Sequence, residues 1–177
     1  ELRTLLTEVT DPTQLASIEP LLADLNSAIF FSPLLTPDSI EYTVVSGDNL
    51  HNIAKRHGTT VGLIQKSNNL LTDLIRPGMK LKISTAKLRI IVKKSSHTLT
   101  LLANDEPLKT YPVATGEKGA TPVGEFTIEA KLIDPTWFHT GVIVPPGSPE
   151  NMLGTRWLGL SLPGMAFMAR QSLNRSA

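Results

Sequence analysis

The chain has 177 residues, 41% of them hydrophobic and 19% charged, a composition typical of folded globular domains and not of disordered chains. Seventeen basic against sixteen acidic residues leave a formal net charge of +1, which offers no long-range attraction to nucleic acid or to an anionic membrane. Cysteine is absent, which excludes disulfides, thiolate metal sites and a thiol nucleophile among these residues. No apolar run approaches the ~20 residues that cross a bilayer, and no basic-then-apolar leader is visible at the start.

Residues 1–35 are predicted to form a helical arm. Apolar residues are spaced for one face of a first helix at Leu2, Leu5, Leu6 and Val9. Pro12 suits the first turn of a second helix, in which Pro20 is expected to cause a kink or a restart. Prolines and an aspartate then mark a linker, which we assign to residues 36–40.

Residues 41–84 are predicted to form a strand, two helices and a second strand. The first strand is indicated by β-branched residues at 42–45, and Asp48 in the following turn is placed to cap the first helix. Gly58 ends that helix at its C′ position, and one of the two threonines that follow it starts the second helix. A half-buried last strand is indicated where apolar residues alternate with lysines, at Met79, Leu81 and Ile83.

This region resembles a LysM domain along its whole length, and we assign residues 41–84 to it. The opening strand and turn of that family match residues 41–50, the first helix and its turn match 53–60, the second helix matches 63–68, and the closing turn and strand match 74–81. The resemblance implies a βααβ fold and a ligand made of N-acetylglucosamine-containing sugars, either peptidoglycan or chitin.

In that family the sugar lies between the first strand–helix loop and the second helix–strand loop. Carried over to this sequence, the implied groove residues are Gly47, Asp48, Asn49 and Leu50 on one side and Asn69, Leu70, Leu74 and Ile75 on the other. Backbone amides would bond acetamide carbonyls, while apolar side chains would cover the apolar face of the sugar. The alternative is that the glycines serve the turns alone and that Asp48 is first a helix cap. His51 and His57 have no carboxylate or thiol neighbours in sequence and are expected to be surface histidines.

Residues 87–164 are predicted to be all-β. Short strands are indicated at 88–92, 98–102, 111–114 and 124–128, with a hairpin turn at Asn104 and Asp105. Residues 165–177 break this pattern, because strand alternation is missing, and we assign them as an atypical tail.

The all-β region resembles the front part of the L,D-transpeptidase catalytic domain of the YkuD type. The most specific match is Ala-Thr-Pro-Val-Gly-Glu-Phe at residues 120–126, which follows the family's Thr-Pro-x-Gly-x-Phe motif. The family implies a cysteine, in a Ser-His-Gly-Cys type segment, that attacks a stem-peptide carbonyl and passes the acyl group to the amine of a second stem peptide. That segment is not found in these residues and no serine-based replacement is recognisable, so we assign no catalytic residue, metal or cofactor. Trp137 and Trp157 are expected in a core or a groove wall, and His139 is not assigned as a general base.

A reading-frame slip is our hypothesis for the tail. Shifted by one base, the codons from Gly164 to Arg170 force two glycines and permit a histidine between them, so they can spell the family's Tyr-Gly-Ile-His-Gly-Thr strand. The alternative is a genuine divergent tail. Resequencing that finds an intact frame through an unrelated segment would contradict the slip.

The sequence therefore predicts an α+β chain with a helical arm, a LysM module and an incomplete all-β L,D-transpeptidase-like domain. We interpret it as a bacterial cell-wall protein that binds peptidoglycan through LysM and belongs to a family that cross-links stem peptides. The alternatives are a catalytically inactive binding module and a non-functional truncated fragment. The expected partners are peptidoglycan glycan strands and stem peptides, with no nucleic acid and no membrane span, and the resemblance implies the cell envelope, periplasm or cell wall.

Overall fold

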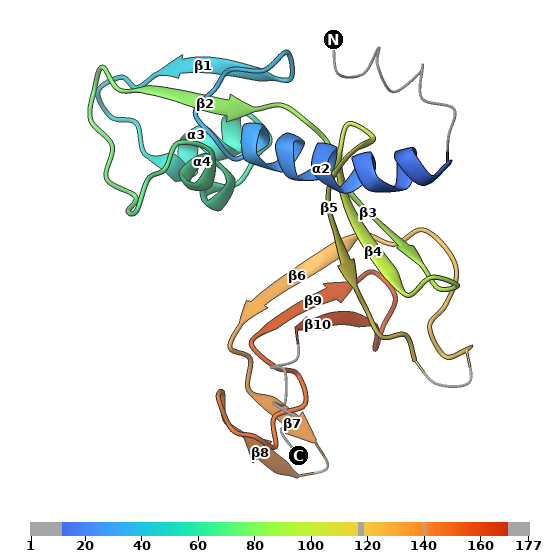
Figure 1. Cartoon of the computed structure of the whole chain (residues 1–177). Helices are drawn as coiled ribbons and strands as arrows, with labels where there is room; N and C mark the ends of the chain where they lie inside the picture. Colours follow the sequence, from blue (N-terminus) through green and yellow to red (C-terminus); the bar gives the residue numbers. More distant parts are fainter. Residues whose placement is uncertain (1–11, 117–118, 140, 170–177) are drawn as a thin grey trace. The chain divides into compact units, whose positions relative to one another are not determined.

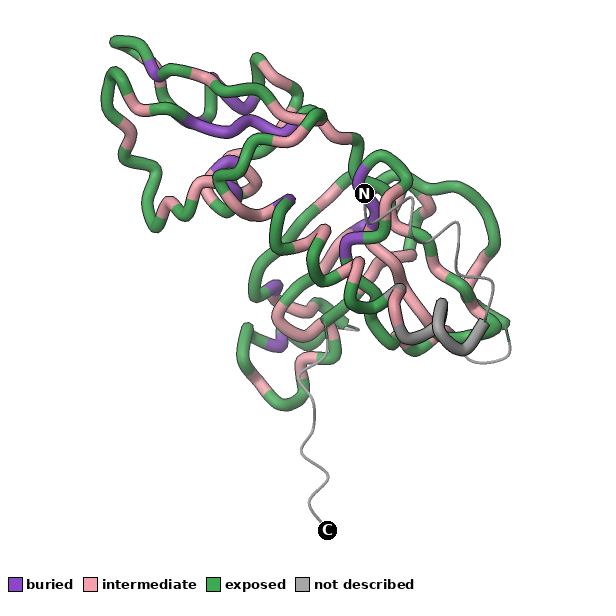
Figure 2. Tube along the Cα trace, turned by 45° about the horizontal axis from the view of Figure 1, so that its top comes forward, coloured by how far each residue is buried: buried purple, intermediate pink, exposed green. Residues whose placement is uncertain are grey.

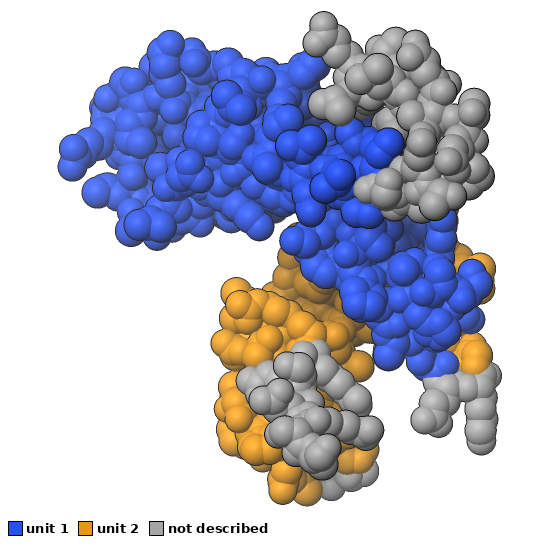
Figure 3. Space-filling model, viewed as in Figure 1, with its two compact units in different colours: residues 1–118 blue, residues 119–177 orange. Residues whose placement is uncertain are grey.

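The computed structural model describes residues 12–116, 119–139 and 141–169 (Figure 1). Helices and strands are mixed along these ranges, which confirms the predicted α+β class. The chain divides into two compact units, residues 1–118 and 119–177 (Figure 3), and each is described by itself. No helix in the described ranges combines the length and the apolar character that crossing a membrane requires.

The helical arm is represented by α2, Pro12–Phe30, and the expectations for residues 1–11 lie outside the described residues. Pro12 occupies the first position, where its missing N–H has no helical partner to lose. The expected restart at Pro20 is wrong, since α2 runs through it, and contacts of the following half-helix hold that half in place. Asn26 Nδ2 donates to the Pro107 carbonyl over 3.3 Å, and Phe30 is buried at 5% exposure. The helix ends at Phe30, so the prediction of helix for residues 31–35 is wrong. Pro33, three residues later, restricts the chain.

A two-stranded antiparallel sheet forms the base of the next module. Strand β1, Ser39–Thr43, pairs with β2, Lys80–Ser84. Because β2 extends to Ser84, its pairing with β1 continues back to Ser39. Residues 39–40 were predicted as linker, but they belong to the strand. Helices α3, Leu50–Arg56, and α4, Val61–Ser67, complete the expected strand–helix–helix–strand order (Figure 1). Their apolar sides and β2 enclose a core of Val44, Leu50, Ile53, Ala54, Ile64, Leu81 and Ile83.

The two short helices are capped by local side chains. The N-cap of α3 is Asn49, whose Oδ1 accepts from the Asn52 N–H over 2.8 Å, and not Asp48 as predicted. Asp48 faces back into its own turn instead. Gly58 follows α3 with a φ of +63°, a left-handed conformation that confirms its predicted C′ role. Thr60 caps α4 through its hydroxyl, which accepts from the Leu63 N–H over 3.2 Å.

From Leu81 to Ser84, strand β2 is buried at apolar and polar positions alike, and only Lys80 at its start is exposed, so the predicted half-burial is wrong. Lys82 is only 3% exposed. Its Nζ donates to three carbonyls at the end of α2, those of Ile29 over 3.0 Å, Phe30 over 3.3 Å and Ser32 over 3.1 Å. The last carbonyls of a helix need donors, and a cation suits that end of the helix dipole. Desolvation by burial lowers the pKa of Lys82 from its ordinary value.

A second cluster lies where α2 meets a three-stranded antiparallel sheet. Its strands are β3, Leu88–Lys93, β4, Thr98–Ala103, and β5, Glu106–Pro112. The cluster is made by Phe30, Ala103 and Leu108. The first two strands confirm the prediction, whereas β5 begins earlier than predicted. The turn between β4 and β5 is the expected hairpin, since Asn104 and Asp105 have φ of 46° and 69°.

Within its described residues, the second unit holds five strands and little core. Strands β6, Ile128–Ile133, β9, Arg156–Leu160, and β10, Ala166–Ala169, form one antiparallel sheet, and β7, Trp137–His139, pairs with β8, Val142–Val144. Buried positions gather in the first unit and are sparse here (Figure 2). The predicted strand at 124–128 starts only at Ile128, because the chain turns at Gly124 with a φ of +157°. The prediction of no strand after residue 164 is wrong for β10, which pairs with β9.

We predict that Lys82→Met lowers the free energy of unfolding by about 1–3 kcal/mol, because three helix-terminal carbonyls lose a charged donor. Chemical denaturation followed by circular dichroism measures it. The matched control is Lys80→Met, which removes an exposed ion pair with Glu41 and is expected to cost less than about 1 kcal/mol. Equal losses in the two variants would contradict the capping role.

The wild type and Lys82→Met also give a test of pH dependence. Because burial lowers the pKa of Lys82, the folded state binds fewer protons than the unfolded state between that lowered pKa and 10.5. The free energy of unfolding of the wild type relative to Lys82→Met should therefore rise as pH increases through this window. A flat difference between the two profiles would show that burial leaves the ammonium group unperturbed.

Candidate functional site

Two loops of the first unit lie side by side at one end of the β1–β2 sheet. The first joins β1 to α3, residues 44–49, and the second joins α4 to β2, residues 68–79. The Val44 N–H donates to the Met79 carbonyl and the Gly78 N–H to the Val44 carbonyl, each over 2.8 Å. The two halves of the predicted groove are therefore pinned together by backbone pairing.

The first loop is built around the carboxylate of Asp48. This group accepts from the Tyr42 hydroxyl over 2.7 Å and from the Val45 N–H over 3.0 Å. Arg56 pairs with it over 3.6 Å, and also donates to the Tyr42 hydroxyl over 2.9 Å. The Asp48 side chain is only 5% exposed. Gly47 makes the turn possible, with a φ of +89° that L side chains rarely adopt.

The electrostatics of this loop follow from those contacts. The Val45 N–H and then the Tyr42 hydroxyl hold the pKa of Asp48 below its ordinary value of 3.8. The hydrogen bond to Asp48 raises the pKa of Tyr42. The carboxylate is thus kept ionised by internal donors, and its contribution is to shape the turn and not to meet a ligand.

The second loop presents apolar side chains to solvent. Leu74 is 69% exposed and Leu71 is 98% exposed. Leu70 and Ile75 are half-buried and pack against the core of the same module. Between Leu71 and Leu74, the Asp73 Oδ1 accepts a hydrogen bond from Gln65 Nε2 over 2.8 Å, and this bond ties the loop to α4. The sequence pattern did not single out Leu71. The signal for it was the crowding of leucines in the run Leu70-Leu71-Thr-Asp-Leu74, not all of which enter the core.

The eight predicted groove residues divide into two groups. Gly47, Asn49, Asn69 and Leu74 are exposed on the paired loops. Leu50 is 2% exposed and belongs to the core, because it is the first residue of α3 and turns inward. The Leu50 side chain is therefore not on the surface of the groove. Asp48, Leu70 and Ile75 lie beneath that surface and support it.

The histidines and tryptophans noted in the sequence have defined surroundings in the structure. His57 is half-buried with its ring edge-on to Tyr42 at 5.4 Å, so the surface assignment is wrong for it, whereas His51 is exposed. Trp137 stacks on His139 with ring centroids 5.0 Å apart. Trp157 lies across Gly159, where an added Cβ would come within 2.5 Å of the indole. Over the described ranges, no group of three or more His, Cys, Asp or Glu side chains is arranged to hold a metal ion.

Comparison with known proteins finds two domain families in the chain. The sequence model of the LysM domain matches residues 42–84, and that of the L,D-transpeptidase catalytic domain, YkuD, matches residues 87–171. The second match runs past residue 164, into the stretch that the sequence pattern sets apart as a tail.

Similar proteins share parts or most of their length with it. A protein named putative L,D-transpeptidase YkuD from Bacillus subtilis is 30% identical over 129 residues, which cover 69% of this chain and 70% of that protein. Putative L,D-transpeptidase YqjB from the same organism is 34% identical over 76 residues, 42% of each chain. A probable endopeptidase p60 of Listeria monocytogenes is 54% identical over 41 residues, 23% of this chain and 8% of that protein.

We predict that the stability advantage of the wild type over Asp48→Asn depends on pH. Because the pKa of Asp48 is lowered in the folded state, its contribution is fully present above 3.8 and is lost as pH falls through the folded pKa. Urea unfolding at several values between about pH 2.5 and pH 6 measures the difference. Asp105→Asn, an exposed carboxylate on a hairpin turn, controls for the loss of one acid. A difference that does not shrink in acid would contradict the ionised carboxylate as the organiser of the loop.

Proposed function

Because the chain belongs to the YkuD-type L,D-transpeptidase family and carries a LysM domain ahead of the matched catalytic region, we propose that its residues 42–84 bind the glycan strands of peptidoglycan. The two domains make it a protein of the cell wall or cell envelope. The domain limits that we propose are an arm from α2 to residue 35, LysM at 41–84 and the transpeptidase-like region from 87.

One observation carries the binding proposal. Leu71 and Leu74 stand exposed on a loop that is paired with the loop of Gly47 and Asn49. An N-acetylglucosamine unit has an apolar ring face and an acetamide group with one donor and one acceptor. Exposed leucines suit the ring face, while exposed loop amides suit the acetamide, the usual division between apolar and polar contacts in a ligand site. Isolated exposed leucines without such polar neighbours would not favour a sugar.

The chemistry of the transpeptidase family is not assigned to these residues. A cysteine acyl-enzyme needs a thiol, and the 177 residues contain no cysteine. The proposal for them is therefore wall binding, with strands β3–β10 representing the matched part of the catalytic domain. Cross-linking of stem peptides is proposed only for the family's complete catalytic domain.

We predict that Leu71→Asn combined with Leu74→Asn weakens binding to insoluble peptidoglycan about 10-fold, because each exposed side chain gives up part of its apolar contact with sugar. Sedimentation of the purified chain with peptidoglycan, followed by titration with chitotetraose, measures it. Leu21→Asn, which replaces a leucine on α2 about as exposed as Leu74, is the control and should bind like the wild type.

Variants of Leu50 are unsuitable for this purpose, since a core truncation costs about 2–5 kcal/mol and would confuse unfolding with lost binding. Unchanged sedimentation of the double variant, with a native circular dichroism spectrum, would show that the glycan does not lie over this loop.

A further inference from the structure

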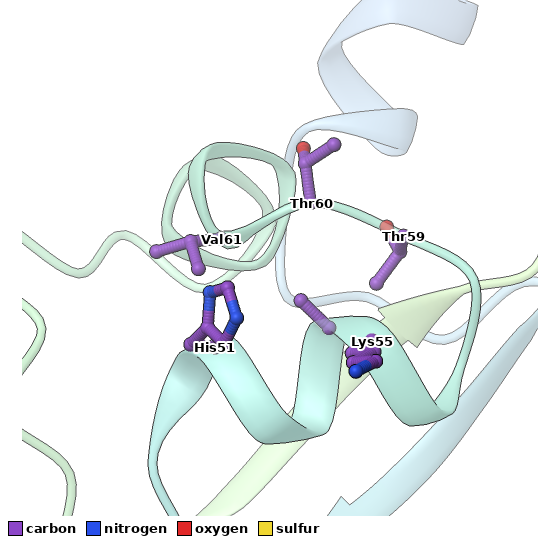
Figure 4. Close-up of a pocket in the computed structure, with 6 residues that line it drawn as sticks. His51, Lys55, Thr59, Thr60 and Val61 are labelled. Carbon is purple, nitrogen blue, oxygen red and sulfur yellow. The ribbon is translucent and has the colours of Figure 1, made fainter.

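An open hollow of about 430 Å³ lies between α3 and the start of α4. It is lined by His51, Ala54, Lys55, Thr59, Thr60 and Val61 (Figure 4). None of the eight predicted groove residues lines it. The hollow is therefore a separate feature of the LysM module that the proposed glycan site does not use.

The walls of the hollow are mixed, with the apolar part the larger. His51 and Val61 lie opposite each other, and the methyl group of Thr59 points into the space (Figure 4). Ala54 contributes a buried methyl group at 4% exposure. The hydroxyl of Thr59 is buried and has no hydrogen-bond partner among the described residues. The apolar part of these walls suits a small alkyl group, and the Thr59 hydroxyl suits a polar group beside it.

The rim of the hollow carries the ammonium group of Lys55 beside the imidazole of His51. His51 and Lys55 are four residues apart on α3 and so lie on the same side of the helix. No acidic side chain lines the hollow, and within the described part of the chain neither residue forms an ion pair. The next basic residue, Arg56, is by contrast paired with Asp48. An ammonium group beside an apolar wall favours a ligand that combines a small alkyl group with a carboxylate.

We propose that this hollow binds an alanine-like carboxylate segment of the peptidoglycan stem peptide, with a methyl group against Ala54 and Val61 and a carboxylate at Lys55. Stem peptides carry alanyl methyl groups and free carboxylates, whereas chitin has the methyl groups of its acetamides but no carboxylate, so the carboxylate is what distinguishes them. The inference rests on the proposed function, since the glycan would occupy the paired loops while its peptide reaches the hollow. The LysM module thereby distinguishes peptidoglycan from other N-acetylglucosamine polymers.

The test uses the whole chain, labelled with ¹⁵N, and three soluble probes. These are chitotetraose, a GlcNAc–MurNAc disaccharide bearing a tetrapeptide, and the same disaccharide with its carboxylates methyl-esterified. Chitotetraose is expected to shift amide signals of residues 47–49 and 69–75 only. The free acid should also shift signals of residues 51–61, and the ester should not. Equal shifts of residues 51–61 by acid and ester, or none by either, overturn the proposal.

Lys55→Met separates the two sites by affinity. It should weaken binding of the disaccharide tetrapeptide about 5-fold, the equivalent of one partly exposed charge pair, while leaving chitotetraose affinity unchanged. Lys80→Met, an exposed lysine on β2, controls for loss of one positive charge, and retained signal dispersion controls for folding. Unchanged peptide affinity in Lys55→Met overturns the hollow as the site. If the wild type does not bind chitotetraose, but the free-acid disaccharide tetrapeptide still shifts residues 51–61, only the glycan groove is overturned.

Discussion

Three carbonyl groups at the end of α2 converge on the ammonium group of Lys82, and the order of the first unit depends on this arrangement. A buried lysine is tolerated only where it finds such acceptors. Because Lys82 lies in β2 between Leu81 and Ile83, its bonds tie the helix end to the strand that closes the LysM core. The same helix end places Phe30, which fills the second cluster against β4 and β5. One polar interaction thus joins two apolar cores that share no buried residue.

Much of the first unit could be predicted from short-range chemistry. Gly58 ends a helix and Asn104 forms a hairpin turn because their backbone conformations are set by their nearest neighbours. The burial of Lys82 could not be predicted, since its acceptors come from a helix about fifty residues earlier in the sequence. Strand limits failed for a related reason, because pairing of β1 extends as far as its partner strand allows and not as far as β-branched residues do.

The candidate site shows the same division. The two loops were predicted because the glycine turns and the family spacing are local signals. The inward direction of Leu50 was not, since a residue at a loop–helix boundary can serve either, and only the packed core decides. Asn49 and not Asp48 caps α3, because both residue types can cap a helix and the hydroxyl of Tyr42, six residues from Asp48, draws the carboxylate away. The exposure of Leu71 could not be predicted either, because it depends on which leucines the packed core takes in.

Asn68, the residue after α4, has a side chain that behaves as a piece of strand. Its amide donates to the Lys82 carbonyl over 2.8 Å and accepts from the Lys82 N–H over 2.7 Å, on the side of β2 that faces away from β1. An unpaired strand edge is a template on which a second chain can assemble into aggregates. Asn68 closes this edge at Lys82, so copies held close together on a polymer cannot pair through that position of β2.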